Sequence, residues 1–134
     1  MTIFESPVLT ALGKQLDSAA LTQRVIANNV ANVNTPGFKK SHVSFAEDLK
    51  RALERRAPDL ATSHPRHLGG VLEMGQVTPR VVQDRDTIMS YGRNNVDVDQ
   101  EMVNLAANTI LYNVSAGALS GRMGLLGYVI RGGR

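Results

Sequence analysis

The stretch from Ala27 to Lys39 reads Ala-Asn-Asn-Val-Ala-Asn-Val-Asn-Thr-Pro-Gly-Phe-Lys, and it marks the place where a long apolar segment must end. Asparagine amides compete for backbone hydrogen bonds, so they suit the last turns of a helix better than its middle. Pro36 and Gly37 are typical of the centre of a type II turn, in which the glycine supplies a positive φ. We expect a helix that ends by Asn34, then a tight turn, then Phe38 on an apolar surface. The residues of this signature turn are Asn28, Asn29, Asn32, Asn34, Thr35, Pro36, Gly37 and Phe38.

Before the turn, apolar residues recur at alternating intervals of three and four, which is the heptad spacing of a coiled-coil seam. Ser6 and Pro7 provide an N-cap and a first helical residue. Gln23 is the one polar member of the row. The spacing predicts a long helix with either coiled-coil-like or ordinary amphipathic packing. Its seam consists of Leu9, Leu12, Leu16, Ile26, Val30 and Val33.

A second long apolar segment follows Asn-Asn-Val-Asp-Val-Asp at positions 94–99. Asp97 or Asp99 can cap it, and Glu101 in the first turn suits the helix dipole. The three–four spacing then continues for about 29 residues, which corresponds to roughly 43 Å of helix. The seam of this second helix consists of Met102, Leu105, Tyr112, Leu119, Met123, Leu126 and Ile130.

Glycines are frequent in the second half of this segment, at positions 117, 121, 124 and 127. Glycine is costly inside a helix, but a row of small side chains lets another helix approach closely. A helix that breaks near Gly117 or Gly121 is the alternative.

Between the two long segments, the sequence predicts a short helix over 44–56, with Ser44 and Glu47 as a capping box. Residues 57–95 are rich in proline and glycine, which leaves room only for short strands such as Gly70–Met74 and Val77–Gln83. The basic residues Lys50, Arg51, Arg55 and Arg56 are interleaved with acidic ones and favour a solvated helix face over a nucleic-acid contact.

The composition points away from catalysis and metal binding. The chain has no cysteine. The histidines at 42, 64 and 67 lack the regular element and the further ligands that a metal site needs. Ser115 and Ser120 lie in a predicted helix with no nearby histidine, and no phosphate-binding glycine loop follows a strand. We therefore expect no enzyme activity, no cofactor and no small-molecule substrate.

Charge is concentrated in the middle of the chain. Residues 1–34 and residues 101–134 carry only four charged side chains each. A helix on the surface of a monomer normally has a charged outer face, so both terminal segments are expected to be covered on more than one side. The N-terminus lacks the basic and apolar regions of a cleavable signal peptide, and no run approaches the roughly 18 apolar residues that span a bilayer.

Two stretches also resemble a known family. Residues 27–39 resemble the N-terminal signature of bacterial flagellar rod and hook proteins, which often carry leucine at the position of Val30. The sequence from Asn94 to Ala106, then Tyr112, and the ending Gly-Tyr-Val-Ile-Arg-Gly-Gly-Arg resemble the C-terminal half of the short proximal-rod members of that family. The resemblance covers roughly residues 6–45 and 92–134. Two proximal-rod members of similar size share the turn motif, and both remain open.

The resemblance implies a structural subunit of the flagellar basal-body rod, a tube in the periplasm that transmits torque. It further implies export through the flagellar type III apparatus without signal-peptide cleavage. The implied partners are further copies of the chain, other rod proteins and the base of the basal body at the inner membrane.

Taken together, the sequence predicts a mainly α fold in which two long terminal helices pair as a coiled-coil-like hairpin. The predicted terminal helical domain comprises residues 1–38 and 96–134, and residues 39–95 form an intervening region with a short helix and loops or short strands. A cytoplasmic coiled-coil adaptor is one alternative and would form a small discrete oligomer. A basic nucleic-acid-binding module is the other, and its affinity would fall steeply with salt.

Overall fold

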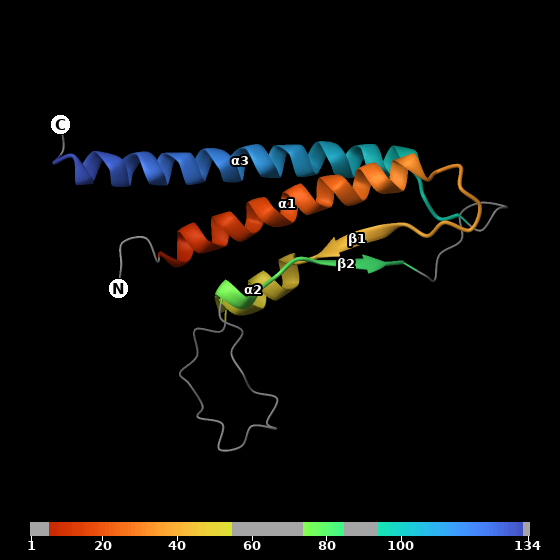
Figure 1. The fold of residues 1–134 in the computed structure, drawn as a ribbon, viewed down its shortest axis with the longest axis horizontal. Helices are drawn as coiled ribbons and strands as arrows, with labels where there is room; N and C mark the ends of the chain where they lie inside the picture. Colours follow the sequence, from red (N-terminus) through yellow and green to blue (C-terminus); the bar gives the residue numbers. More distant parts are fainter. Residues whose placement is uncertain (1–5, 55–73, 85–93, 133–134) are drawn as a thin grey trace, which may run out of the picture.

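The computed structural model describes residues 6–54, 74–84 and 94–132. Its elements in chain order are helix α1 (Pro7–Ala31), strand β1 (Ser41–Ser44), helix α2 (Ala46–Glu54), the 3-10 helix η1 (Met74–Gln76), strand β2 (Arg80–Gln83) and helix α3 (Val98–Ile130). Helix α1 lies between α3 on one side and the β1–β2 pair with α2 on the other (Figure 1). The predicted hairpin of two long helices is confirmed.

Helix α1 begins and ends where the local sequence signals place its limits. Ser6 is the N-cap in an extended conformation, and Pro7 is the first helical residue. After the helix ends at Ala31, the amide of Phe38 donates to the carbonyl of Thr35 at 3.3 Å across the turn. Gly37, at the third position of that turn, has φ of 74°, as the type II turn prediction requires.

Helix α3 is one continuous helix of 33 residues, about 50 Å long. Asp97 caps it, because its Oδ1 atom accepts hydrogen bonds from the amides of Asp99 and Gln100 at 3.0 and 3.2 Å. The helix runs through Gly117 and Gly121, so the alternative of a break at these positions is wrong. None of the described helices has the length and apolar character needed to cross a membrane.

The region between the long helices differs from the prediction in detail. Ser44 lies in β1, so α2 begins only at Ala46 and the expected capping box with Glu47 does not start the helix. Strand β1 pairs antiparallel with β2, with Ser41 opposite Gln83 and Ser44 opposite Arg80.

Of the two strands predicted for this region, the structure describes only one. The strand expected over Val77–Gln83 is confined to Arg80–Gln83. The strand expected over Gly70–Met74 lies outside the described residues except for Met74, which begins η1.

The apolar core is small and lies around α1. Its buried members are Ala19, Val25 and Ile26 of α1, Phe45 before α2, and Val77 after η1. The core therefore joins α1 to the short elements on one side. The contact between α1 and α3 depends on a different set of residues, described next.

Candidate assembly surface

The seam predicted in α1 lies in the interior or at its margin. Ile26 is buried, and the remaining members, Leu9, Leu12, Leu16, Val30 and Val33, are half-buried. The prediction for this helix thus placed its apolar row on a covered side.

The seam predicted in α3 divides into two rows. Leu105, Leu119 and Leu126 are half-buried. The other members are exposed: Met102 by 43%, Tyr112 by 41%, Met123 by 51% and Ile130 by 65%. The described chain itself therefore covers only part of this seam.

The residues of α3 that are buried instead are Glu101, Asn108 and Ser115, which are seven apart. They lie on the side that faces α1, because the Asn108 amide donates to the Ala19 carbonyl at 2.9 Å and Glu101 accepts from Asn29. The contact row of α3 is therefore partly polar. A prediction that places only apolar residues inside a helix pair missed it, and the heptad spacing of the three polar residues is the signal that was available.

Asn29 connects three segments through its side-chain amide. Its Nδ2 atom donates to Oε2 of Glu101 at 3.0 Å and to the carbonyl of Ser41 at 2.8 Å. Its Oδ1 atom accepts from the Ser41 amide at 3.0 Å. Because Asn29 is almost fully buried, these bonds fix α1, the start of β1 and the start of α3 relative to one another.

Asn94 and Asn95 hold the signature turn from the other side. The Nδ2 atom of Asn94 lies 2.9 to 3.0 Å from the carbonyl oxygens of Asn32, Val33 and Thr35. These carbonyls lie beyond the last residue of α1, and two of them also accept backbone amides of the turn, Asn32 from Thr35 and Thr35 from Phe38. The two asparagines were predicted only to precede the second helix, and their role in closing the turn is a finding of the structure.

Asn95 joins the turn to the strand pair. Its Oδ1 atom accepts from the Lys40 amide at 2.6 Å, and its Nδ2 atom donates to the Asp84 carbonyl at 3.1 Å. We call the side-chain hydrogen bonds of Asn29, Asn94 and Asn95 the polar clasp. Of the signature turn itself, Asn28, Asn34, Thr35, Pro36 and Gly37 are exposed and Asn32 and Phe38 are half-buried.

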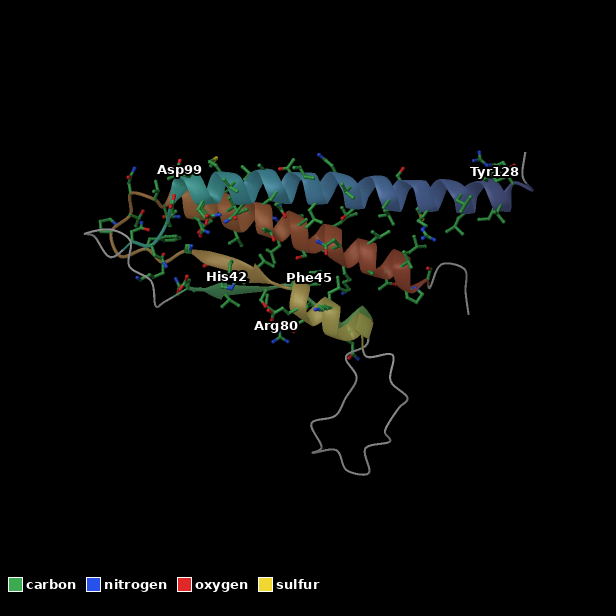
Figure 2. All side chains as sticks on the ribbon, turned by 180° about the vertical axis from the view of Figure 1, so that it is seen from behind. His42, Phe45, Arg80, Asp99 and Tyr128 are labelled. Atoms are coloured by element: carbon green, nitrogen blue, oxygen red, sulfur yellow. The ribbon has the colours of Figure 1, made fainter. Side chains whose placement is uncertain are left out.

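Helix α3 presents large apolar side chains to solvent along most of its length. Besides the exposed seam members, these are Val98, Val103, Ile110, Leu111, Val114, Leu125, Tyr128 and Val129. Figure 2 shows side chains projecting from α3 along its whole length, with Tyr128 near its end. Contiguous apolar surface of this kind marks an interaction site in a soluble protein.

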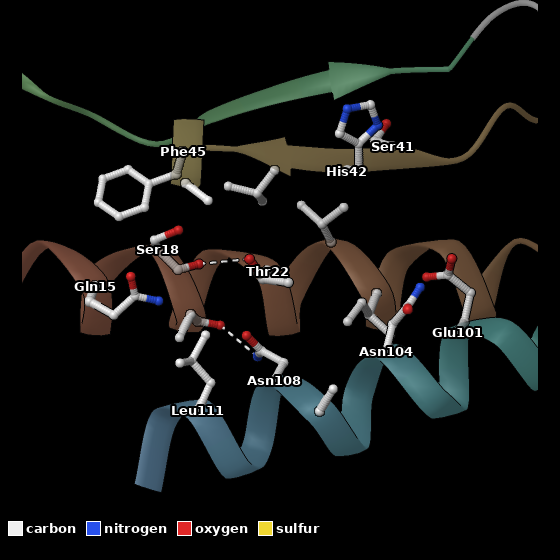
Figure 3. A pocket seen from close by; sticks show the side chains of 16 residues that line it. Gln15, Ser18, Thr22, Ser41, His42, Phe45, Glu101, Asn104, Asn108 and Leu111 are labelled. Atoms are coloured by element: carbon white, nitrogen blue, oxygen red, sulfur yellow. Dashed lines mark hydrogen bonds between the residues drawn. The ribbon is translucent and has the colours of Figure 1, made fainter. Parts of the chain in front are cut away.

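A groove of about 400 Å³ runs along α1 between β1 and α3 (Figure 3). Val25, Ile26, Phe45 and Leu111 contribute apolar walls, and Glu101 lines it near the signature turn. Its volume falls within the range of sites that hold ligands or side chains of a partner.

The histidine and lysine candidates do not gather into a site. His42 is exposed at the groove, and His64 and His67 lie outside the described residues. Within 6–54, 74–84 and 94–132, no three histidine or acidic side chains are grouped to hold a metal ion. Lys50 is exposed on α2, whereas Arg55 and Arg56 and the side chain of Arg51 are not described.

The sequence is similar to those of several known proteins. A family model described as "Flagella basal body rod protein" matches residues 16–39, which include the second half of α1 and the signature turn. A relative from Borrelia hermsii, named flagellar basal body rod protein FlgB, is 42% identical over 85% of this chain and 87% of its own length. The FlgB proteins of Bacillus subtilis (strain 168) and Escherichia coli (strain K12) are 34% and 30% identical, over 100% and 81% of both chains respectively.

The Bacillus subtilis relative matches the whole chain, the other two match most of it, and all three share one name. Of the two proximal-rod members of similar size that share the turn motif, the C-terminal half of the sequence pointed to FlgB, and these relatives confirm it. The chain belongs to the FlgB family of flagellar basal body rod proteins.

Proposed function

We propose that this chain, a structural subunit of the flagellar basal-body rod, polymerises through its N- and C-terminal helices into the proximal, torque-transmitting part of the rod in the periplasm. The observation that carries the proposal is the apolar surface of α3. Val103, Ile110, Val114, Val129 and Ile130 are each 63–66% exposed on one helix. Such surface is stable in water only when neighbouring molecules cover it.

The two rows of the α3 seam have different roles in this proposal. Leu105 and Leu119 pack within the subunit together with Leu9, Leu12, Leu16, Ile26, Val30 and Val33, and Leu126 is half-buried in the part of α3 that follows them. Met102, Tyr112, Met123 and Ile130 contact neighbouring subunits. The surfaces that meet are different on the two partners, and such contacts generate a helical filament when the rotation between neighbours does not close into a ring.

The partners in this proposal are further copies of the chain, other rod proteins and the base of the basal body at the inner membrane. The chain reaches the periplasm through the flagellar type III export apparatus. Its role is structural and not enzymatic, and it needs no cofactor. Neither a nucleic-acid-binding module nor a cytoplasmic adaptor is supported by the relatives, which are rod proteins by name.

Val129→Asp tests the proposal, because Val129 is 65% exposed and is therefore not part of the subunit's own core. We expect the variant to fold normally and to lose self-association in sedimentation velocity, because assembly would bury an unpaired carboxylate. The same variant should fail to restore motility to a bacterium that lacks its own rod subunit. Val81→Asp, at a 52% exposed position of β2, is the matched control. If Val129→Asp assembled and supported motility like the unaltered chain, α3 would not be the assembly surface.

A further inference from the structure

The last turns of α3 extend past α1. Asn108 is bonded to the carbonyl of Ala19, and the two helices run antiparallel. Pro7, twelve residues before Ala19, therefore comes level with Ser120, twelve residues after Asn108. Residues 121–130 extend past the first residue of α1, which corresponds to an overhang of about 15 Å. Figure 1 shows this overhang at the C-terminal end of α3.

The overhang exposes apolar side chains on more than one side. Leu125, Tyr128, Val129 and Ile130 are each at least 52% exposed. At 100° per residue, their directions spread over about 200° around the helix, and the exposed side chain of Arg122 lies among them. A flat contact along one face would leave part of this apolar surface in water, so the overhang calls for a recess.

The groove beside α1 is a recess of complementary character. It is open to one side and lined by α1, β1 and α3, with Glu101 towards the signature turn and Phe45 towards the opposite end (Figure 3). Glu101 is the one carboxylate among its described lining residues, and these include no lysine or arginine. The overhang carries the opposite charge, because Arg122 and Arg131 are exposed and no acidic residue follows Glu101 in the sequence.

We propose that the overhang of one copy occupies the groove of a second copy, with Arg122 facing Glu101 and Tyr128 beside Thr22. This inference rests on the proposed function and specifies one of its contacts. Tyr128 lies six residues beyond Arg122, about 9 Å along the helix, so it comes level with Ala107 of the second copy. Ala107 and Thr22 both line the groove.

The contact also fixes how the copies are arranged. Facing Arg122 with Glu101 offsets the two α3 helices by 21 residues, about 31 Å, along a shared direction. The overhang and the groove are different surfaces, so each bound copy leaves one overhang and one groove free. The contact is therefore head-to-tail and continues along an open row.

The absence of cysteine and tryptophan in the chain allows a clean test. One population carries Thr22→Cys labelled with bimane, and the other carries Tyr128→Trp, which quenches bimane on contact. Within one copy, Thr22 lies level with Leu105, so Tyr128 is 23 residues away along α3, about 35 Å. Quenching can then arise only between copies. Circular dichroism of each variant checks that the chain is folded.

We expect quenching that grows with the concentration of the Tyr128→Trp copy. Val103→Trp, at another exposed apolar position of α3, should give none. Adding Arg122→Glu to the quenching copy should weaken the association roughly tenfold or more, because two carboxylates then meet at the groove. Arg24→Glu makes the same charge change at an exposed position that does not line the groove, and it should leave quenching unchanged.

Self-association by sedimentation without Tyr128→Trp quenching would overturn the overhang–groove contact while leaving the proposed rod function standing. Equal quenching by Val103→Trp, or equal effects of the two glutamate substitutions, would also overturn it. Pairing of two overhangs, seen as quenching of bimane at a Val129→Cys position instead of at Thr22, would replace it with a different contact. A chain that stays monomeric throughout would reject the self-contact, and the motility assay would then decide the rod function separately.

Discussion

The side-chain amide of Asn29 lies 3.0 Å from Oε2 of Glu101, and this buried hydrogen bond joins α1 to α3 across 72 positions of the chain. It lies at the end of the hairpin that also holds the signature turn. A helix pair with a continuous apolar seam can slide by one turn at little cost. A buried amide and carboxylate that satisfy each other permit one register only.

Replacing Asn29 by alanine should lower the free energy of unfolding by about 2–4 kcal/mol, because Glu101 is then left buried without its partner. Urea denaturation followed by circular dichroism measures the loss. Asn28→Ala changes the exposed neighbour and should cost less than about 1 kcal/mol. Equal effects of the two substitutions would show that the buried hydrogen bond adds nothing to stability.

Replacing Asn94 should loosen the signature turn specifically. Asn94→Ala removes a donor shared by three backbone carbonyls, and Asn94→Asp places a carboxylate against them. We expect Asn94→Asp to destabilise more than Asn94→Ala, and amide hydrogen exchange at residues 32–38 to accelerate in both. Asn113→Ala, at an exposed position of α3, is the control. If the Asn94→Asp variant were as stable as the unaltered chain, the role of Asn94 as a hydrogen-bond donor to these carbonyls would be contradicted.

Gly37→Val should destabilise the folded subunit by about 1–2 kcal/mol, because a branched side chain is strained at its φ of 74°. A Cβ at this position would meet no atom within 4 Å, so the cost is one of backbone conformation and not of crowding. Gly37→Asn should cost less, since asparagine tolerates the left-handed region. Thermal melts of the two variants give the comparison. Identical melting temperatures would argue against a cost that arises from the positive φ.

Gly121→Ala should have opposite effects on the stability of the folded subunit and on its assembly. A Cβ at Gly121 meets nothing within 4 Å in the subunit, so alanine should stabilise α3 by about 1 kcal/mol. If a neighbouring helix packs against the glycine row, the added methyl group should weaken assembly at the same time. Thermal melting of dilute protein and sedimentation of concentrated protein measure the two effects. If Gly121→Ala raised both the thermal stability and the extent of assembly, close packing of a neighbouring helix against the glycine row would be excluded.

The limits of the long helices were predictable from the sequence because their signals are local. Ser6 with Pro7, Pro36 with Gly37, and Asp97 act through the backbone within a few residues, and each is where the prediction put it. Strand β1 had no such signal. Its four residues, Ser-His-Val-Ser, owe their extended state to pairing with β2, some 40 positions away.

The orientation of α3 was less predictable for a related reason. Its apolar residues extend around the helix, so apolar spacing selects no single inner face. The inner face is set by Glu101, Asn108 and Ser115, and two of these are bonded to groups of α1 that lie 72 and 89 positions away. The spacing alone also did not determine which apolar rows pack within the subunit and which are left to contact neighbouring subunits.

The polar clasp has a mechanical consequence. Directional hydrogen bonds anchor α3 to α1 at Glu101 and again at Asn108, whereas its last turns project beyond α1, so the projecting part behaves as a beam fixed at one end. A force applied at the free end is delivered to the anchored end as a bending and twisting load. Hydrogen bonds with defined geometry resist such shear, whereas apolar contacts, being non-directional, yield by slipping. In the row of copies that we propose, a subunit built this way would pass rotation to its neighbours without its own two helices losing their alignment.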